Sequence, residues 1–343
     1  MIWLTWRQFR VQAAAAAIVL AVLGVLFAVT GAGLSHQYAV SGLPVCHAHG
    51  DCGQLANVFV NELRSAGVYK VVFTLGTILM YVVPPIIGVF WGAPLVTREL
   101  ESGTFRLAWT QSVTPNRWLA VKLGVLGLAS AATAGLLSLM VTWWSVPVDK
   151  VSQYGAVNGA LSRIGPAIYG TRDIVPVGYA LFGFALGVAV GTLIRRTLPA
   201  MALTLAGTAF AEIAMPLWIR GHLIPPIHSS GPLNVNDTGL MITQAGQLTI
   251  IPGAGRPGAW ILSERAVTTA GKAFTGQASR ACMDAGRQQC NAWLASLHLR
   301  QLITFQPASR FWELQIMETG IFVLLALLLA GFCAWRLGRR RFS

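Results

Sequence analysis

The chain has 343 residues, of which 55% are hydrophobic and 11% are charged, and its mean hydropathy is +0.60. A soluble domain carries about twice this share of charged residues, so the composition excludes an ordinary soluble protein and indicates an integral membrane protein. The formal net charge of +13 does not indicate nucleic-acid binding, because no basic stripe is interleaved with exposed aromatic residues.

Six apolar segments, each about 20 residues long, match the length that crosses the hydrocarbon core of a bilayer. They are residues 13–34, 71–95, 119–141, 174–194, 198–219 and 316–335. The first segment has no signal-peptide cleavage site, so we expect it to be retained as a helix. Pro84 and Pro85 are expected to break the second segment. The predicted fold class is an all-α integral membrane protein with six transmembrane helices in contact with the lipid bilayer.

The distribution of Lys and Arg predicts the orientation. With the N-terminus inside, twelve Lys and Arg residues fall in cytoplasmic segments and five in the two short exterior loops. The positive-inside rule therefore places both termini in the cytoplasm. Arg outnumbers Lys, and Ala and Gly are abundant, which is typical of a GC-rich bacterial genome. We expect a multi-pass protein of a bacterial cytoplasmic membrane.

Four cysteines fall in predicted exterior loops, where disulfides form in an oxidising environment. Cys46 and Cys52 bracket the stretch CHAHGDC, for which a zinc or copper site is the alternative to a disulfide; we predict no metal site. Cys282 and Cys290 are eight residues apart in a predicted helix, too far for a bridge if that helix is unbroken. Either the helix breaks at Gly286, or one of these cysteines pairs with the first loop.

The segment 220–315 is predicted to form a small exterior domain over the fifth and sixth helices, pinned by disulfides. Residues 242–251 and 258–262 are typical of short strands, and residues 275–303 of a helix. The remaining chain divides into residues 1–12, residues 13–219 with a cytoplasmic loop at 96–118, and residues 316–343 with the last helix and a basic cytoplasmic tail.

The polar stretch between the second and third spans begins like a helix. Thr97 is expected to act as its N-cap, with Glu99 and Glu101 in the first turn, where carboxylates suit the helix dipole. Leu100 and Phe105 are among the residues of its apolar side. The residues alone fit a helix on the lipid surface and a docking surface for a soluble partner equally well.

A resemblance favours the docking surface. The stretch RELESGTFRLAWTQSVTPNRWLAVKL resembles the cytoplasmic loop of the type-2 permeases of ATP-binding-cassette (ABC) exporters, which forms a coupling helix in a cleft of the ATPase subunit. MIWLTWRQFR resembles the N-terminal amphipathic elbow helix of the same family, and FQPASRFWELQIMETGIF the exterior lead-in to the last helix of actinobacterial members. The resemblance is weak over residues 46–61 and 224–300.

The resemblance implies an ABC exporter whose two permease subunits, identical or paralogous, assemble with two ATP-binding subunits that hold ATP and Mg²⁺. The cargo would be an amphipathic or lipid-like molecule such as a drug, antibiotic or lipid. The implied ATPase-coupling residues are Arg98, Glu99, Glu101, Gly103, Thr104, Phe105 and Arg117. The sequence contains no G-x-x-x-x-G-K-[ST] phosphate loop, so we expect no ATPase site and no cofactor on this chain. The alternative is a membrane sensor or assembly protein with a ligand-binding exterior domain and a cytoplasmic docking loop.

Two carboxylates within predicted spans are candidates for the substrate path. Glu212 lies in the fifth span, where a charged group costs about 2.5–3.5 kcal/mol. It would meet a cationic group of the substrate, or else lie at a dimer interface or be protonated. Glu318 lies near the outer end of the sixth span and is expected to reach water or a partner such as Arg310.

Overall fold

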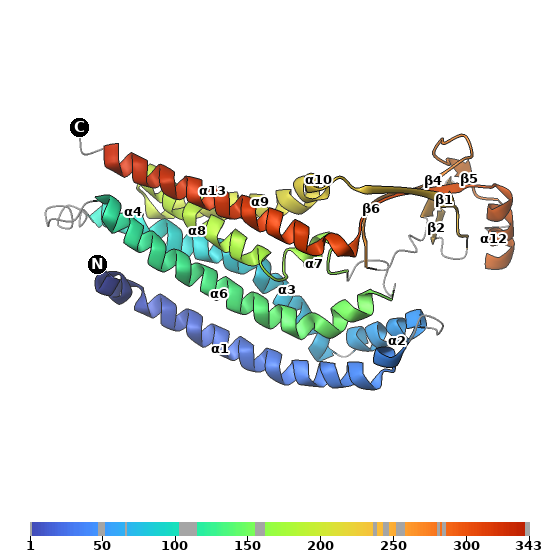
Figure 1. The fold of residues 1–343 in the computed structure, drawn as a ribbon, viewed down its shortest axis with the longest axis horizontal. Coiled ribbons are helices and arrows are strands. Elements are labelled where there is room, and N and C mark those ends of the chain that lie inside the picture. Colours follow the sequence, from blue (N-terminus) through green and yellow to red (C-terminus); the bar gives the residue numbers. More distant parts are fainter. Residues whose placement is uncertain are drawn as a thin grey trace.

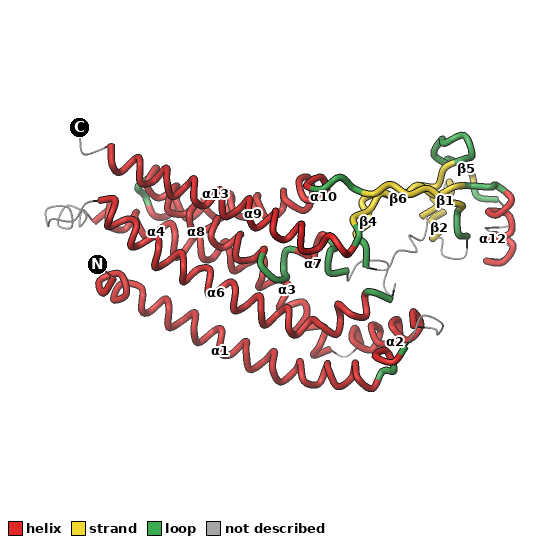
Figure 2. Tube along the Cα trace, in the orientation of Figure 1, coloured by secondary structure: helices red, strands yellow, loops and turns green. Residues whose placement is uncertain are grey.

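A computed structural model describes residues 2–339 except 47–51, 66, 103–114, 155–161, 236–238, 243–246, 252–257, 280–281 and 283–285. Six helices in it are long and apolar enough to cross a membrane, which confirms the predicted fold class. They form an elongated bundle with both termini at one end and a small strand-containing domain beyond the other end (Figure 1). Figure 2 shows that the strands are confined to that domain.

The first span is one long helix, α1 (Ile2–Val40). The expected elbow helix is therefore not a separate element, because the helix continues through residue 12. Its first turns lie at an angle to the rest of α1 (Figure 1). Phe9 marks where α1 joins the bundle, since its ring is buried and packs edge-on against Trp91 with centroids 4.9 Å apart.

The second span runs through α3 (Gly67–Ile87), a π-helical stretch η2 (Gly88–Gly92) and α4 (Ala93–Ser102). The prediction that Pro84 and Pro85 break this helix is wrong. Proline removes backbone donors, and the helix here widens into π geometry after the prolines instead of ending. Thr97 is not an N-cap either. It lies inside α4, and its hydroxyl donates to the carbonyl of Ala93 at 2.9 Å, so the helix begins long before it.

The fourth span matches its predicted bounds to within one residue, whereas the other spans keep their predicted centres but have different ends. The third and sixth are longer than predicted, and the fifth contains a second π-helical stretch, η3, at Pro216. The remaining helices are η1 (Leu43–Val45), α2 (Cys52–Ser65), α6 (Pro115–Ser152), α7 (Pro166–Tyr169), α8 (Val175–Ile194), α9 (Thr197–Ala214), η3 (Met215–Ile219), α10 (Arg220–Leu223), η4 (Ala308–Arg310) and α13 (Phe311–Arg339).

Helix α8 lies at the centre of the bundle. In its most apolar stretch of 18 residues 61% of the residues are buried, whereas the corresponding share in α1 is 6%. Glycines let it approach the second span closely. A Cβ atom placed on Gly88 of η2 would lie 2.6 Å from the carbonyl oxygen of Gly183, and one placed on Gly183 would lie 2.9 Å from that of Pro84. Such small-residue seams are how membrane helices pack backbone against backbone.

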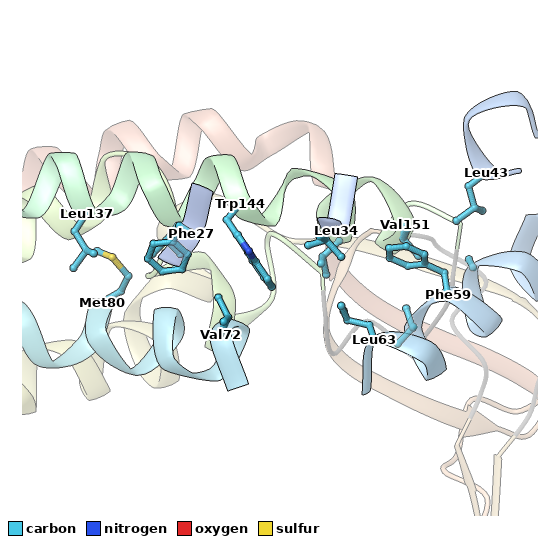
Figure 3. Packing of buried hydrophobic residues seen from close by; sticks show 14 residues of the cluster. Phe27, Leu34, Leu43, Phe59, Leu63, Val72, Met80, Leu137, Trp144 and Val151 are labelled. Carbon is cyan, nitrogen blue, oxygen red and sulfur yellow. The ribbon is translucent and has the colours of Figure 1, made fainter. Parts of the chain in front are cut away.

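An apolar core joins α1, α2, α3 and α6 towards the end of the bundle next to the strand-containing domain (Figure 3). After the orientation expected from the sequence, this end is called the outer end and the strand-containing domain the exterior domain. Phe27, Trp144 and Val72 meet within it, and the indole of Trp144 donates to the hydroxyl of Thr30 at 2.9 Å. The core fixes the outer half of α1, which elsewhere exposes most of its apolar surface to lipid.

The exterior domain contains two antiparallel three-stranded sheets in the orders β1-β6-β4 and β2-β3-β5. The strands are β1 (Ile227–Pro232), β2 (Gly239–Ile242), β3 (Gln247–Ile251), β4 (Trp260–Val267), β5 (Gly276–Gln277) and β6 (Arg300–Gln306). The helix predicted over 275–303 is wrong in extent: residues at both ends of this range form β5 and β6, which pair with other strands, and α12 (Arg287–Ser296) lies between them.

Two disulfides pin the outer end. Cys46 is bonded to Cys52 and Cys282 to Cys290. The second bond is possible because the chain turns at Gly286, where φ is +86° and α12 begins. Of the two alternatives for this pair, the structure therefore has the break at Gly286.

Candidate functional site

The ends of α4 and α6 nearest the chain termini are held together by an ion pair. The ammonium of Lys122 on α6 contacts Oε1 of Glu99 on α4. Lys122 is only 2% exposed, and its Nζ lies 4.5 Å from the centroid of the Trp118 ring. A lysine withdrawn this far from water needs a carboxylate partner, so Glu99 fixes where α6 begins relative to α4.

Glu101 ties α4 to α9 in a similar way. Its carboxylate accepts the backbone N–H of Thr197 at 2.8 Å and the hydroxyl of Thr197 at 2.7 Å. Thr197 is the first residue of α9, where the helix dipole favours a negative charge. These hydrogen bonds from the Thr197 side chain and backbone hold the pKa of Glu101 below its ordinary value.

The predicted coupling residues are thus of three kinds. Gly103, Thr104 and Phe105 lie outside the described residues. Arg98 and Arg117 are exposed at the base of the same loop. Glu99 and Glu101, expected to face an ATPase, are both engaged within the chain. Lys122 and Thr197 were not predicted as their partners, because nothing in the sequence pairs residues 23 and 96 positions apart.

At the outer end, Glu318 of α13 belongs to a fully buried network. The guanidinium of Arg220 donates to its carboxylate from Nε at 2.7 Å and from Nη2 at 3.0 Å, and the hydroxyl of Tyr179 donates at 2.6 Å. Arg220 and Glu318 both have side-chain exposures of 0%. Glu318 therefore has a partner, as expected, but it does not reach water and the partner is Arg220. Arg310 instead donates to the carbonyl of Pro225.

Arg220 also holds the segment that leads into α8. Its Nη1 donates to the carbonyl of Pro166 at 3.2 Å, and its guanidinium lies 4.2 Å from the Tyr169 ring centroid. One side chain therefore joins α10, α13 and α7. Such a forked, charge-assisted contact is geometrically specific, and it holds these three elements together.

Glu212, the other carboxylate predicted for a substrate path, lies on the buried face of α9. Its residue exposure is 5%, and its Oε1 has no hydrogen-bond partner among the described residues. Thr204 and Thr208 share this face, but their hydroxyls donate to backbone carbonyls of α9. No hydrogen bond or ion pair between Glu212 and Glu318 is found among the described residues.

A second buried cation lies near the outer end. Arg172 is 1% exposed, and its Nε lies 3.6 Å from a carboxylate oxygen of Asp149 on α6. Burial lowers the pKa of Arg172, and Asp149 opposes this change. Sequence reasoning counted Arg172 only as an exterior-loop charge, because its position in the loop does not reveal its burial.

These features define a polytopic helical membrane protein whose polar contacts lie at the two ends of the bundle. Residues 17–220 match the family described as ABC-2 membrane transporter related. The match covers more than half of the chain, and the protein belongs to this family. It stops where the exterior domain begins. No curated protein and no solved structure matches the chain.

Proposed function

We propose that this chain is the transmembrane subunit of an ABC exporter that moves an amphipathic or lipid-like molecule out across a bacterial cytoplasmic membrane. Family membership supports a transporter subunit. ATP and Mg²⁺ would bind a separate ATP-binding subunit, since this sequence has no phosphate-binding loop. Two permease subunits, identical or paralogous, would form the complete pathway.

The proposed orientation places both termini and the 103–114 loop in the cytoplasm. The ends of α1, α4, α6 and α13 that flank these segments lie together in Figure 1, and the exterior domain lies at the opposite end. The two disulfides are also at that opposite end, which suits an oxidising exterior.

The observation that carries the proposal is the anchoring of the loop base. Glu99 joins α4 to α6 through Lys122, and Glu101 joins α4 to α9 through Thr197. A force applied to the loop by a closing ATPase pair would therefore move three spans together. In this proposal Glu99 and Glu101 are positioning residues, and the docking contacts come from the loop itself.

The test is co-purification of an ATP-binding subunit from native membranes. Phe105→Asp in the loop is expected to abolish recovery of the ATPase. Met241→Asp, on an exposed position of β2 at the other end, is the matched control and should leave recovery unchanged. Reversing the charges of Glu99 and Glu101 is a poorer test, because it would also break their contacts within the bundle. Failure of the native chain to retain any ATPase in several mild detergents would refute the proposal.

A second candidate function is ligand binding by the exterior domain. A cavity of about 480 Å³ opens beside β3 and β4, and its lining includes Gln247, Arg265 and Phe274. This volume is in the range of small-molecule sites. If no ATPase is recovered, binding measurements on the full chain, with Arg265→Ala as the variant, would test this sensor-like function.

A further inference from the structure

A cavity of about 270 Å³ lies among α1, the η2–α4 segment and α6, next to the Glu99–Lys122 ion pair. Unlike the cavity beside β3 and β4 and the one beside α12, it lies within the membrane bundle. Neither the proposed coupling of the loop nor the family match assigns it a ligand. Its position, lining and charge together indicate one.

One side of the cavity is apolar. Phe9 and Trp91 form an edge-to-face wall, and Phe90, Pro94, Leu95 and Leu126 add to the apolar surface. Phe90 is 53% exposed on the outside of the bundle, where the surrounding medium is lipid. The apolar side therefore offers a hydrocarbon chain continuous contact between the bilayer and the cavity.

The other side is polar and carries more positive than negative charge. Arg98, Glu99 and Lys122 line it, so two cations accompany one carboxylate. The Lys122 ammonium has three N–H donors, of which Glu99 accepts one within the described contacts. Arg98 is exposed at this side. An anionic group that accepts hydrogen bonds suits this charge balance.

The depth of the cavity suits a lipid headgroup. Three candidate spans have their ends at Phe9, Glu99 and Arg117, so the cavity lies at the membrane–water boundary. Its volume is slightly below the roughly 300 Å³ at which drug-sized sites begin. It can hold a headgroup and the first part of an acyl chain, with the rest of the chain remaining in the bilayer.

We propose that this cavity binds one anionic phospholipid, with its phosphate at Arg98 and Lys122 and the start of an acyl chain against Phe90 and Leu95. The lipid would bridge α1, α4 and α6 next to the loop base. A soluble anion fits less well, because the apolar wall would then stay uncovered. The proposal needs only membrane insertion, and it holds or fails independently of ATP-driven transport.

The test uses the full chain reconstituted in nanodiscs of equal phosphatidylglycerol and phosphatidylcholine. The protein is then extracted gently, and retained lipids are counted by native mass spectrometry. One phosphatidylglycerol per chain is expected in preference to phosphatidylcholine. Arg98→Gln should reduce this preference about fivefold, the effect of one cation beside an anionic lipid, and Arg98→Lys should largely restore it. Leu95→Trp, which fills the cavity, should remove the retained lipid.

Arg10→Gln is the matched control, since Arg10 is an exposed cation next to Phe9 on α1 and does not line the cavity. It should leave lipid retention unchanged. Equal losses in Arg10→Gln and Arg98→Gln would mean diffuse attraction by surface charge and would overturn the site. Equal retention of both lipids by the native chain would overturn it as well. A different amphiphile at one copy per chain in protein from native membranes would replace the phospholipid as occupant.

Discussion

The buried pair of Arg220 and Glu318 makes a sharp prediction about stability. Neither side chain is exposed to solvent, so removing one partner leaves the other charge buried and unpaired. Such a change costs about 3–5 kcal/mol in free energy of unfolding. We therefore expect Glu318→Leu and Arg220→Met each to destabilise the bundle by this amount.

The double variant should be far less harmful than the sum of the two. Replacing a buried ion pair by apolar residues of similar volume is often neutral. Here two further losses are expected, because the Tyr179 hydroxyl would lose its acceptor and the Pro166 carbonyl would lose its Arg220 donor, each at a cost of about 1–3 kcal/mol. Arg220→Met with Glu318→Leu should therefore be close to either single variant, and the double-mutant cycle should give a coupling energy of about 3 kcal/mol or more.

Reversible unfolding in mixed micelles, followed by circular dichroism, would measure these free energies. Arg310 provides the control, because the sequence suggested it as the partner of Glu318, whereas it contacts Pro225 and Gln306. Arg310→Met should cost little and should show no coupling to Glu318→Leu. Additive effects of Arg220→Met and Glu318→Leu would refute the pairing of Arg220 with Glu318. Coupling of Glu318 to Arg310 would refute it as well.

Three further predictions concern other parts of the bundle. Gly183→Val should destabilise the protein by about 1–3 kcal/mol through overpacking, whereas Gly320→Val, with open space around it, should not; thermal melts in detergent would compare them. Cys282→Ser should destabilise the exterior domain by about 2–3 kcal/mol, seen as faster proteolysis of that domain. The lowered pKa of Glu101 means that its contribution to stability is present near neutral pH. This contribution is lost as the pH falls through the ordinary Glu range near about 4.3 and then through the lowered pKa of the folded state. Thr197→Val should weaken this acid sensitivity in melts recorded against pH.

The spans could be predicted from sequence because the bilayer imposes one strong constraint, an apolar helix of sufficient length. Helix ends could not, since a helix continues past the hydrocarbon wherever other contacts support it. Helix α6 reaches Ser152 because Val148 and Val151 pack in the outer core. The amphipathic helix α2 was missed for a related reason: it is too polar to read as a span, although Phe59 and Leu63 are buried against the same core.

The sequence could predict which polar residues matter, but it could not predict which of them form pairs. Glu318 drew attention because a carboxylate in a span is costly, but its partner is 98 residues away and lay just past the end of the predicted fifth span. Similarly, Glu99 and Glu101 led to the prediction that a helix starts at Thr97. That prediction did not consider that the preceding apolar helix continues through this residue. Local capping signals cannot reveal that a helix has already begun.

Helix α9 and the π-helical stretch η3 connect the two ends of the bundle. Glu101 holds the start of α9, and α9 leads through the π-helical stretch η3 directly to Arg220. The second span has a matching π-helical stretch, η2, packed against α8. Because π-helical stretches frequently lie at functional sites, η2 and η3 are the places where a displacement of the loop base would be absorbed or passed on. A movement of α4 that pulls on Thr197 would then bear on the Arg220–Glu318 pair. Two discrete packings of these helices, with this pair joined or separated, would give the closed and open states of that end that the proposed exporter would need.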